Sequence, residues 1–206
     1  MDNTVKLNKE ALEPIWVQIG KTKLDGEKCL QVYKTEKLDE HDIDSMAKLK
    51  DLTFHNGIIE VQVRSRLLPD APDYARGFIG FAFRIAPDNA KFEAFYIRPA
   101  NGTSKDPVRK AHSCQYFTYP EYTYQYYREH GIEGCEAPCD IALDEWIPLR
   151  AEIVQETARF YVQDMDFPVL VIENLKLGAD AKGQIGLFVD TGTEGYFKDL
   201  KIVSYD

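Results

Sequence analysis

Apolar and polar residues alternate with a period of two along much of the chain. In segment 58–64, the odd-numbered residues are apolar, and the even-numbered residues from Glu60 to Arg64 are polar. Because successive side chains of a strand point to opposite faces, this pattern predicts a strand with one buried face. Similar patterns predict further strands over 78–85, 93–98, 149–154, 158–162, 169–172, 184–189 and 196–203.

Polar turn sequences rather than long helical segments connect these strands. Residues 86–89 read Ala-Pro-Asp-Asn, and the polar residues 155–157 separate two alternating segments as a hairpin loop would. Only 9–12 and 42–50 have the pattern of short helices. Roughly nine to eleven short strands without helical crossovers predict an all-β fold, a two-sheet antiparallel β-sandwich of the jelly-roll type. The 206 residues contain no linker, repeat or low-complexity tract, so we expect one domain over 1–206.

Composition and charge exclude several classes of function. Hydrophobic residues make up 44% of the chain, which is enough for a full core. With 25 basic and 34 acidic residues, the formal net charge is −9, so we expect neither nucleic acid nor a membrane as partner. No apolar run is long enough to span a bilayer. The first residues contain no apolar signal segment; we expect a cytoplasmic protein if the chain is full length, and a periplasmic or secreted one if an export signal was removed.

The cysteines favour free thiols over a metal site. Cys135 and Cys139 follow His130 at a spacing that is compatible with part of a zinc site. The tight pairing of a zinc ribbon is absent, however, and no second pair follows. Cys29 and Cys114 make an even total of four, which permits disulfides without requiring them. We therefore predict no metal and no cofactor, and no acidic loop resembles a calcium site.

The polar face of the alternating strands contains candidates for ligand contacts. Arg84 ends one strand, Tyr96 and Arg98 end the next, and the preceding segment presents Glu60 and Arg64. If these strands are neighbours, forked hydrogen-bonding groups and an aromatic ring lie side by side. Such a surface suits a sugar, because charged groups bind hydroxyls and the ring packs on the apolar face of the pyranose. The alternative is a solvated face with cross-strand ion pairs.

Segment 116–127 is unusually aromatic, with seven aromatic residues in twelve positions, six of them tyrosines. Tyrosine combines rigid contact area with a polar tip, which is typical of binding loops. The alternative is a cover over the core, and one loop could do both. Tyr116 and its neighbour Gln115 are candidates for ligand binding.

Hydrolysis of a sugar would require two carboxyl groups. Glu40, Asp42 and Asp44 occupy alternate positions but precede the clear strands, so this segment predicts a loop or a helix cap. If the protein is an enzyme, Glu60 or Glu93 is the expected acid or base. Glu93 shares its parity with apolar neighbours, which predicts an inward-facing side chain.

Several sequence blocks resemble the concanavalin A-like lectin/glucanase superfamily. They are most similar to the bacterial domains called 3-keto-disaccharide hydrolases or family 16-like glycoside hydrolase domains, over about residues 50–205. The blocks are 54–61 (Phe-His-Asn-Gly-Ile-Ile-Glu-Val), 77–84 (Gly-Phe-Ile-Gly-Phe-Ala-Phe-Arg), 92–99 (Phe-Glu-Ala-Phe-Tyr-Ile-Arg-Pro), 183–187 (Gly-Gln-Ile-Gly-Leu) and 195–200 (Gly-Tyr-Phe-Lys-Asp-Leu).

The resemblance implies a jelly roll with one concave sheet that faces a carbohydrate. Laminarinase-type members carry E-x-D-x-x-E or E-x-D-x-E on a concave strand. The only E-x-D in this sequence runs from Glu40 to Asp42, with Asp44 in place of the last glutamate. This departure argues against the laminarinase mechanism.

Three functions stay open from the sequence: a glycoside hydrolase-like domain that binds or cleaves a saccharide, a non-catalytic lectin-like module, and a sandwich that meets another protein. A saccharide is the expected ligand. The sequence sets no oligomeric state. The expected contacts are Arg84, Tyr96 and Arg98, with Glu60, Arg64, Gln115 and Tyr116 beside them.

Overall fold

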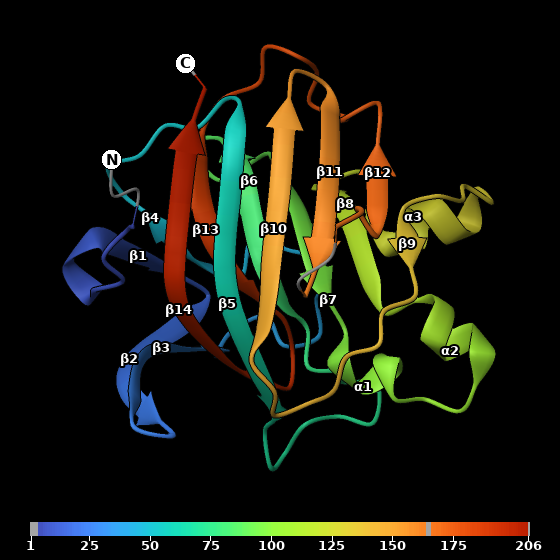
Figure 1. Ribbon diagram of the computed structural model, residues 1–206. Helices are drawn as coiled ribbons and strands as arrows, with labels where there is room; N and C mark the ends of the chain where they lie inside the picture. The colour runs from blue at the N-terminus through green and yellow to red at the C-terminus, as the bar shows by residue number, and fades with distance from the viewer. Residues whose placement is uncertain (1–3, 164–165, 206) are drawn as a thin grey trace.

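The computed structural model describes residues 4–163 and 166–205, which form two antiparallel sheets of seven strands each. The sheets lie face to face, with β14, β5, β10 and β11 in front in Figure 1 and β4, β13, β6, β7 and β8 behind. The front sheet has the order β12 (Leu170–Ile172), β11 (Thr157–Val162), β10 (Ile147–Val154), β5 (Gly57–Leu67), β14 (Thr193–Ser204), β3 (Glu27–Lys34) and β2 (Val17–Leu24). The back sheet has the order β1 (Leu12–Ile15), β4 (Met46–Leu49), β13 (Gln184–Val189), β6 (Ile79–Ile85), β7 (Phe92–Ile97), β8 (Cys114–Tyr119) and β9 (Glu136–Ala137). This architecture confirms the predicted all-β sandwich.

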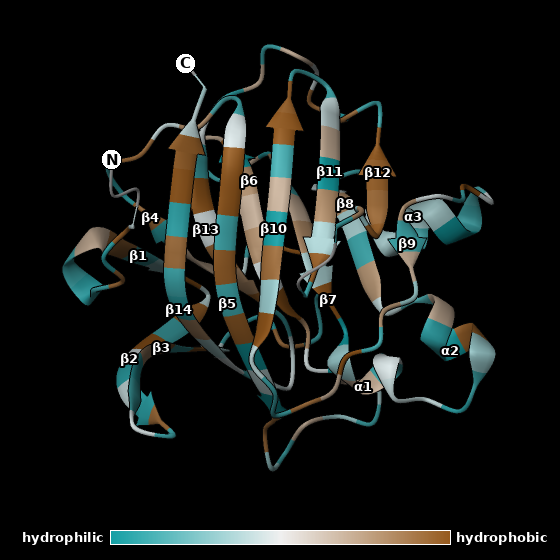
Figure 2. Cartoon of the chain, viewed as in Figure 1, coloured by the Kyte–Doolittle hydropathy of each residue, from teal (hydrophilic) through white to brown (hydrophobic). Residues whose placement is uncertain are grey.

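The alternation of the strands places the main core between the two sheets. Along β5, Ile59, Val61 and Val63 are buried in that core, while the even-numbered residues up to Gln62 are only half buried. Figure 2 shows the same alternation as brown and teal bands along β14, β5 and β10. Residues from 12 to 202 contribute to this one cluster, so burial of apolar surface from both sheets stabilises the sandwich.

The predicted strands are present, and additional strands lie in segments where the alternation is weak. Segment 9–12 forms a 3₁₀ helix (Lys9–Ala11), close to the prediction. The helix predicted over 42–50 is wrong, because β4 (Met46–Leu49) occupies its second half. All four residues of β4 are buried, so no polar face marks the strand in the sequence.

Among the residues that the structure describes, three short α-helices connect strands of the back sheet. They are α1 (Pro99–Gly102), α2 (Pro107–Ala111) and α3 (Tyr124–Glu129). Within the described ranges, no helix has the length and hydropathy needed to cross a bilayer.

The predicted polar surface that joins Glu60 to Arg84 does not exist, for two reasons. First, β5 lies in the front sheet, whereas β6 lies in the back sheet. Second, β6 and β13 shift register between Gln184 and Gly186, and Arg84 adopts a φ of 53°. This bulge reverses the alternation, so that Ile85 packs on the outer face and Arg84 points away from it.

The outer face of the back sheet is apolar at its centre. Ala94 and Tyr96 of β7 lie on this face with Phe117 and Phe188 in a second hydrophobic cluster. Tyrosines of the segment that follows β8 pack against it, including the buried Tyr127. The expectation of a polar trough along the whole face is therefore wrong; polar groups gather only where β7 ends.

Candidate functional site

A cavity of about 690 Å³ borders the outer face of the back sheet where β7 ends. We call it the Tyr96 cavity. α1 and α2, at the lower right of Figure 1, contribute to its wall. Its volume is in the range that small-molecule sites occupy. Its aromatic lining consists of Tyr74, Phe78, Tyr96 and Tyr124, and its polar lining of His41, Asp42, Arg76, Arg98, Asn101, Arg109, His112, Arg128 and Asp190.

Tyr96 and Arg98 form the buried floor of the cavity together with Gln115 of the neighbouring strand. The Arg98 guanidinium lies 5.1 Å from the centre of the Tyr96 ring, and its Nη2 donates to the Tyr96 hydroxyl at 2.7 Å. The same nitrogen donates to Oε1 of Gln115, which also accepts from the Tyr96 hydroxyl at 3.2 Å. Gly80 lies opposite Tyr96 on β6, and a Cβ there would lie 2.9 Å from that of Tyr96. The backbone therefore holds these groups in one fixed arrangement.

Glu136 of β9 balances the charge of Arg98. It accepts a hydrogen bond from Arg98 Nη1 and lies 2.7 Å from Nδ1 of His112 and 3.1 Å from Nη2 of Arg128. Burial opposes the charge on Arg98, but Tyr96 and Glu136 outweigh it and raise the pKa of Arg98. Burial likewise opposes the charge on Glu136, yet the three basic neighbours lower its pKa. Both groups are therefore charged at neutral pH.

Asp42 and Asp190 place two carboxyl groups in the lining of the same cavity. The backbone N–H of Asp42 donates to Oδ2 of Asp190 at 3.0 Å, and Asp42 Oδ2 accepts from the backbone N–H of Tyr124 at 2.9 Å. Asp190 also forms an ion pair of 2.7 Å with the buried Lys34. Burial raises the pKa of Asp42 to about 6, although the bond from Tyr124 opposes this rise.

Asn101 in α1 brings a buried acceptor to the cavity. Its Nδ2 donates to the backbone carbonyl of His112 at 2.9 Å, whereas its Oδ1 has no hydrogen-bond partner among the described residues. The side chain lines the cavity and is only 5% exposed. Because a buried acceptor without a partner costs free energy, this atom favours a ligand that supplies a donor.

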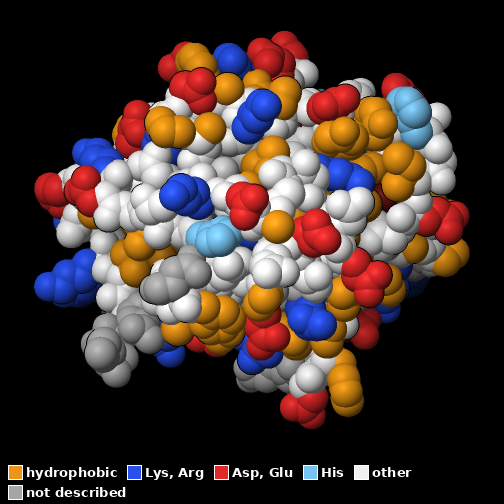
Figure 3. Space-filling model, turned by 90° about the horizontal axis from the view of Figure 1, so that it is seen from above, with side chains coloured by type: hydrophobic (Ala, Val, Ile, Leu, Met, Phe, Trp, Pro, Cys, Tyr) orange, Lys and Arg blue, Asp and Glu red, His pale blue; other side chains and the backbone are white. Residues whose placement is uncertain are grey.

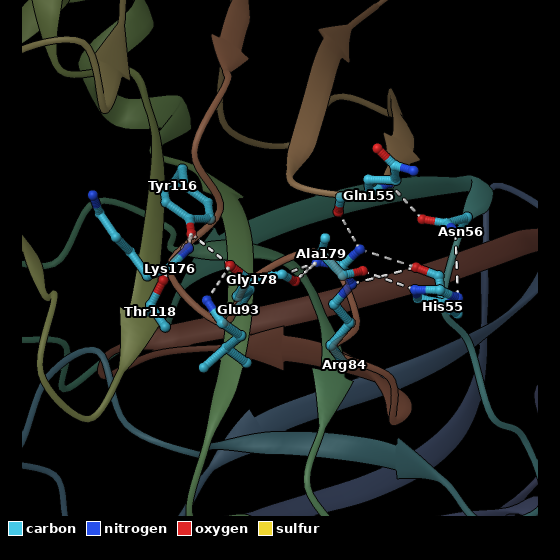
Figure 4. Close-up of polar contacts among 11 residues, drawn as sticks. His55, Asn56, Arg84, Glu93, Tyr116, Thr118, Gln155, Lys176, Gly178 and Ala179 are labelled. Atoms are coloured by element: carbon cyan, nitrogen blue, oxygen red, sulfur yellow. Dashed lines mark hydrogen bonds and ion pairs between the residues drawn. The ribbon is translucent and has the colours of Figure 1, made fainter.

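The structure separates Arg84, Glu93 and Tyr116 from this cavity. They form a buried cluster at the other end of the sandwich, which we call the Arg84 cluster (Figure 4). Arg84 Nη1 lies 3.5 Å from Oε2 of Glu93 and donates to the carbonyl of Gly178 at 3.1 Å. Its other nitrogens donate to the carbonyls of His55 and Gln155.

The carboxylate of the Arg84 cluster is enclosed as well. Glu93 Oε1 accepts from the Tyr116 hydroxyl at 2.7 Å and from the backbone N–H of Leu177 at 3.3 Å. The side chain is fully buried, which confirms that it faces inward as its parity predicted. Burial raises the pKa of Glu93, and Tyr116 and Arg84 oppose that rise. Seen from above in Figure 3, this end of the molecule mixes hydrophobic, acidic and basic side chains.

Glu60 and Arg64 lie on the front sheet, away from both sites. Glu60 is half buried on the outer face beside Arg150 and Lys201, its cross-strand neighbours. Arg64 forms ion pairs of 2.6 Å with Asp25 and 2.5 Å with Asp144. Glu60 thus lies on a polar outer face, whereas Arg64 is buried and paired with carboxylates of two connections. Of the seven expected ligand contacts, the cavity and its floor unite Tyr96, Arg98 and Gln115.

The aromatic segment serves mainly as a cover. Tyr122, Tyr126 and Tyr127 pack on the apolar outer face of the back sheet, and only Tyr124 lines the cavity. The interpretation as a cover therefore describes most of this segment, and its role in ligand binding stays a prediction.

Most residues of the cavity were not identified from the sequence. The alternate carboxylates around Asp42 were noted, and their assignment to a loop is correct, because 40–45 contains no helix or strand. A loop assignment, however, does not predict that Asp42 lies in the same cavity as Tyr96. Arg76, Arg109 and Arg128 lie in separate connections, and no local spacing relates them.

Solved structures with the same architecture include several carbohydrate-related proteins. The carbohydrate-binding module CBM66 from Bacillus subtilis aligns with a TM-score of 0.56 at 15% identity, over 93% of this chain and 97% of that one. A Bacillus subtilis protein with a galectin-like fold aligns with a TM-score of 0.52 at 13% identity, over 90% and 87%. The GH43 protein BlXynB from Bacillus licheniformis aligns with a TM-score of 0.52 at 10% identity, over 98% of this chain but 40% of its own.

These alignments confirm the concanavalin A-like sandwich fold that the sequence blocks predicted. No protein-family model matches the sequence, and no curated protein matches it. At such low identity the likeness concerns the fold, so any function must be argued from the site itself.

Proposed function

We propose that this protein is a carbohydrate-binding domain and that its saccharide ligand occupies the Tyr96 cavity. The main observation in support is that one cavity combines four aromatic rings with buried, fixed polar groups. A sugar ring presents an apolar C–H face and a rim of hydroxyls, and both surfaces need complementary partners.

The polar groups match the hydroxyl rim. Asp42 and Asn101 offer acceptors to the hydroxyl groups of a sugar. Arg98 contributes a fixed positive charge at the floor, because its Nη groups already donate to Tyr96, Gln115, Glu136 and the carbonyl of His112. Because these side chains are buried and already ordered, binding costs little conformational entropy at the floor. Tyr74 is 43% exposed at the rim and packs edge-on against His41 at 5.0 Å, where a ring can close over a ligand.

The likeness to CBM66 and to the GH43 protein supports a saccharide over other small molecules, since both names refer to carbohydrate-active proteins. It does not select a sugar. The expected neighbours Glu60, Arg64, Arg84 and Tyr116 are not part of this proposal, because the cavity does not include them.

A thermal-shift screen against a panel of neutral and acidic oligosaccharides tests the proposal. A ligand at 100 times its Kd stabilises the fold by about 2.7 kcal/mol, so even weak binders raise the melting temperature. Tyr74→Ala at the rim should abolish most of the shift, whereas Tyr205→Ala, another exposed tyrosine far from the cavity, should leave it unchanged. Absence of a shift with every saccharide would overturn the proposal.

A second candidate function is hydrolysis of the bound saccharide, and Asp42 is the observation that favours it. A carboxyl group with a pKa of about 6 remains partly protonated near neutral pH, as a general acid requires. Asp190 is the second carboxyl group in the same cavity. Glu60 and Glu93 do not meet, because Glu60 lies on the front sheet and Glu93 is sealed in the Arg84 cluster.

The two functions differ in the effect of Asp42→Asn. In a hydrolase, this variant binds the oligosaccharide but releases no reducing ends on prolonged incubation, whereas the unmodified protein does. In a pure binding domain, neither protein releases products.

A further inference from the structure

The Tyr96 cavity carries a charge that is opposite to that of the chain as a whole. The protein has a formal net charge of −9, yet four guanidinium groups and only two carboxyl groups line this cavity. The carboxylate of Asp190 is neutralised by Lys34, which lies 2.7 Å away. Glu136 is a single carboxylate shared by Arg98, Arg128 and His112.

Two of the arginines, Arg76 and Arg109, form no ion pair with a carboxylate among the described residues. Arg109 projects from α2, and its guanidinium makes no hydrogen bond or ion pair within 4–163 and 166–205. Arg76 is half buried, and its Nη1 donates only to the backbone carbonyls of Asp73 and Ala75, at 2.6 and 2.7 Å.

These arginines also repel one another across the cavity. Burial lowers the pKa of Arg76, and the nearby charges of Arg109 and Arg98 lower it further, although the carboxylate of Asp73 opposes this shift. An arrangement of like charges around a cavity is unfavourable in the free protein and becomes favourable when an anion enters. Guanidinium groups are suited to carboxylates and sulfates, whose oxygens they bind in pairs.

Contrast with the Arg84 cluster strengthens the argument. There a buried arginine meets a carboxylate and three backbone carbonyls, so it needs no further partner. In the Tyr96 cavity, by contrast, Arg76 and Arg109 lie beside the aromatic rings and form no ion pair with a carboxylate among the described residues.

We infer that the saccharide bound in the Tyr96 cavity is anionic, a sugar carrying a carboxylate or a sulfate that Arg76 and Arg109 recognise. This inference rests on the proposed function and names the chemical class of its ligand. The negative charge of the ligand lies toward α2, and its uncharged ring faces the aromatic lining.

Calorimetric titration with ligand pairs in which the anionic group is present or is esterified or removed tests the inference. One pair is an oligogalacturonide and its fully methyl-esterified form; the other is a sulfated galactan oligosaccharide and its desulfated form. We expect the charged member of at least one pair to bind about tenfold more tightly at low ionic strength. This preference should shrink as salt is added, because exposed charges are screened. The pair that shows the preference identifies the anionic group.

Variants of the two arginines locate the effect. Arg76→Gln and Arg109→Gln should each weaken binding of the charged member roughly fivefold and leave the uncharged member unaffected. Arg159→Gln, which removes an exposed arginine of β11 on the front sheet, is the matched control and should change neither. Titration of inorganic sulfate tests for binding of a bare anion, which should be much weaker than binding of the charged oligosaccharide.

The outcomes separate this inference from the proposed function. Equal binding of charged and uncharged members overturns the anionic inference and leaves a neutral saccharide site in place. Sulfate that binds as tightly as the charged oligosaccharides also overturns it, because the sugar then contributes nothing. Failure of all saccharides, neutral ones included, overturns both.

Discussion

The two ends of the back sheet contain the same types of residue, but these residues have different surroundings. In the Arg84 cluster, an arginine, a glutamate and a tyrosine are joined to backbone groups from three connections, and burial is complete. In the Tyr96 cavity, an arginine, a glutamate and a tyrosine again form a buried group, but additional arginines and rings surround an open volume. The first set closes this end of the sandwich, and under the proposed function the second set prepares a surface for a ligand.

The largest expected effect follows from removing the carboxylate of the closed end. Glu93→Ala leaves the buried Arg84 without its counter-charge, which should lower the free energy of unfolding by about 3–5 kcal/mol. Urea denaturation measures this loss. Ligand affinity of the folded fraction should not change, because Glu93 does not line the cavity.

The double variant Arg84→Met/Glu93→Leu is the control for this prediction. Replacing both partners by apolar groups should restore much of the stability. If the double variant is as unstable as the single one, the pairing account of the cluster is contradicted.

A smaller effect concerns the pH dependence that Asp42 imposes. Its pKa is about 6 in the folded protein against 3.8 as the ordinary value, so the folded state binds more protons between these values. The contribution of Asp42 to stability is therefore present at low pH and lost as pH rises through about 6, a change of about 3 kcal/mol. The measurement is the difference in unfolding free energy between Asp42→Asn and the unmodified protein. Between about pH 4 and pH 7, the unfolding free energy of Asp42→Asn should increase relative to that of the unmodified protein. A constant difference would contradict the raised pKa.

The floor of the cavity should respond to loss of one hydroxyl. Tyr96→Phe removes the acceptor for Arg98 and the donor to Gln115, and should cost about 1–2 kcal/mol in unfolding free energy. Saccharide affinity should fall as well, because Arg98 loses an orienting contact. Tyr33→Phe is the control: its hydroxyl pairs with Gln18 at an exposed position, and the cost there should be below about 0.5 kcal/mol.

The smallest effect on stability is expected at the rim of the cavity. Arg109→Gln should change the unfolding free energy by less than about 0.5 kcal/mol, since this side chain is exposed and makes no ion pair among the described residues. A large loss of stability would show that Arg109 has a structural role, and would weaken the assignment of its charge to a ligand.

The sequence alone was sufficient for the fold class and for much of the strand pattern. Alternation identified β5, β10 and β11 because each has one half-buried or exposed polar face. It failed for β4, which is buried on both sides, and for the neighbour relations of β5 and β6. Which sheet a strand joins depends on long-range pairing, and a local pattern contains no information about it. Extension of the domain over all of 1–206 stays a prediction.

The candidate site was predicted only in part. Tyr96 and Gln115 come together because they are register partners on β7 and β8, and Arg98 directly follows β7 and donates to Gln115. Arg84 was misplaced because a bulge reversed the alternation just before the end of β6, and the sequence contains no residue that marks it. Most of the remaining lining residues lie in the segments that connect the strands. Only the folded sandwich brings these segments together, so the sequence pattern does not predict that they meet.

Mapping of the bound saccharide by NMR tests the central claim most directly. Amide shifts of the isotopically labelled protein are followed while the best ligand of the screen is added. The account predicts changes clustered at 41–42, 74–78, 96–112 and 124–128, around the Tyr96 cavity. Changes clustered instead around His55, Arg84, Gln155 and Gly178, or on the outer face of the front sheet around Glu60, would contradict it.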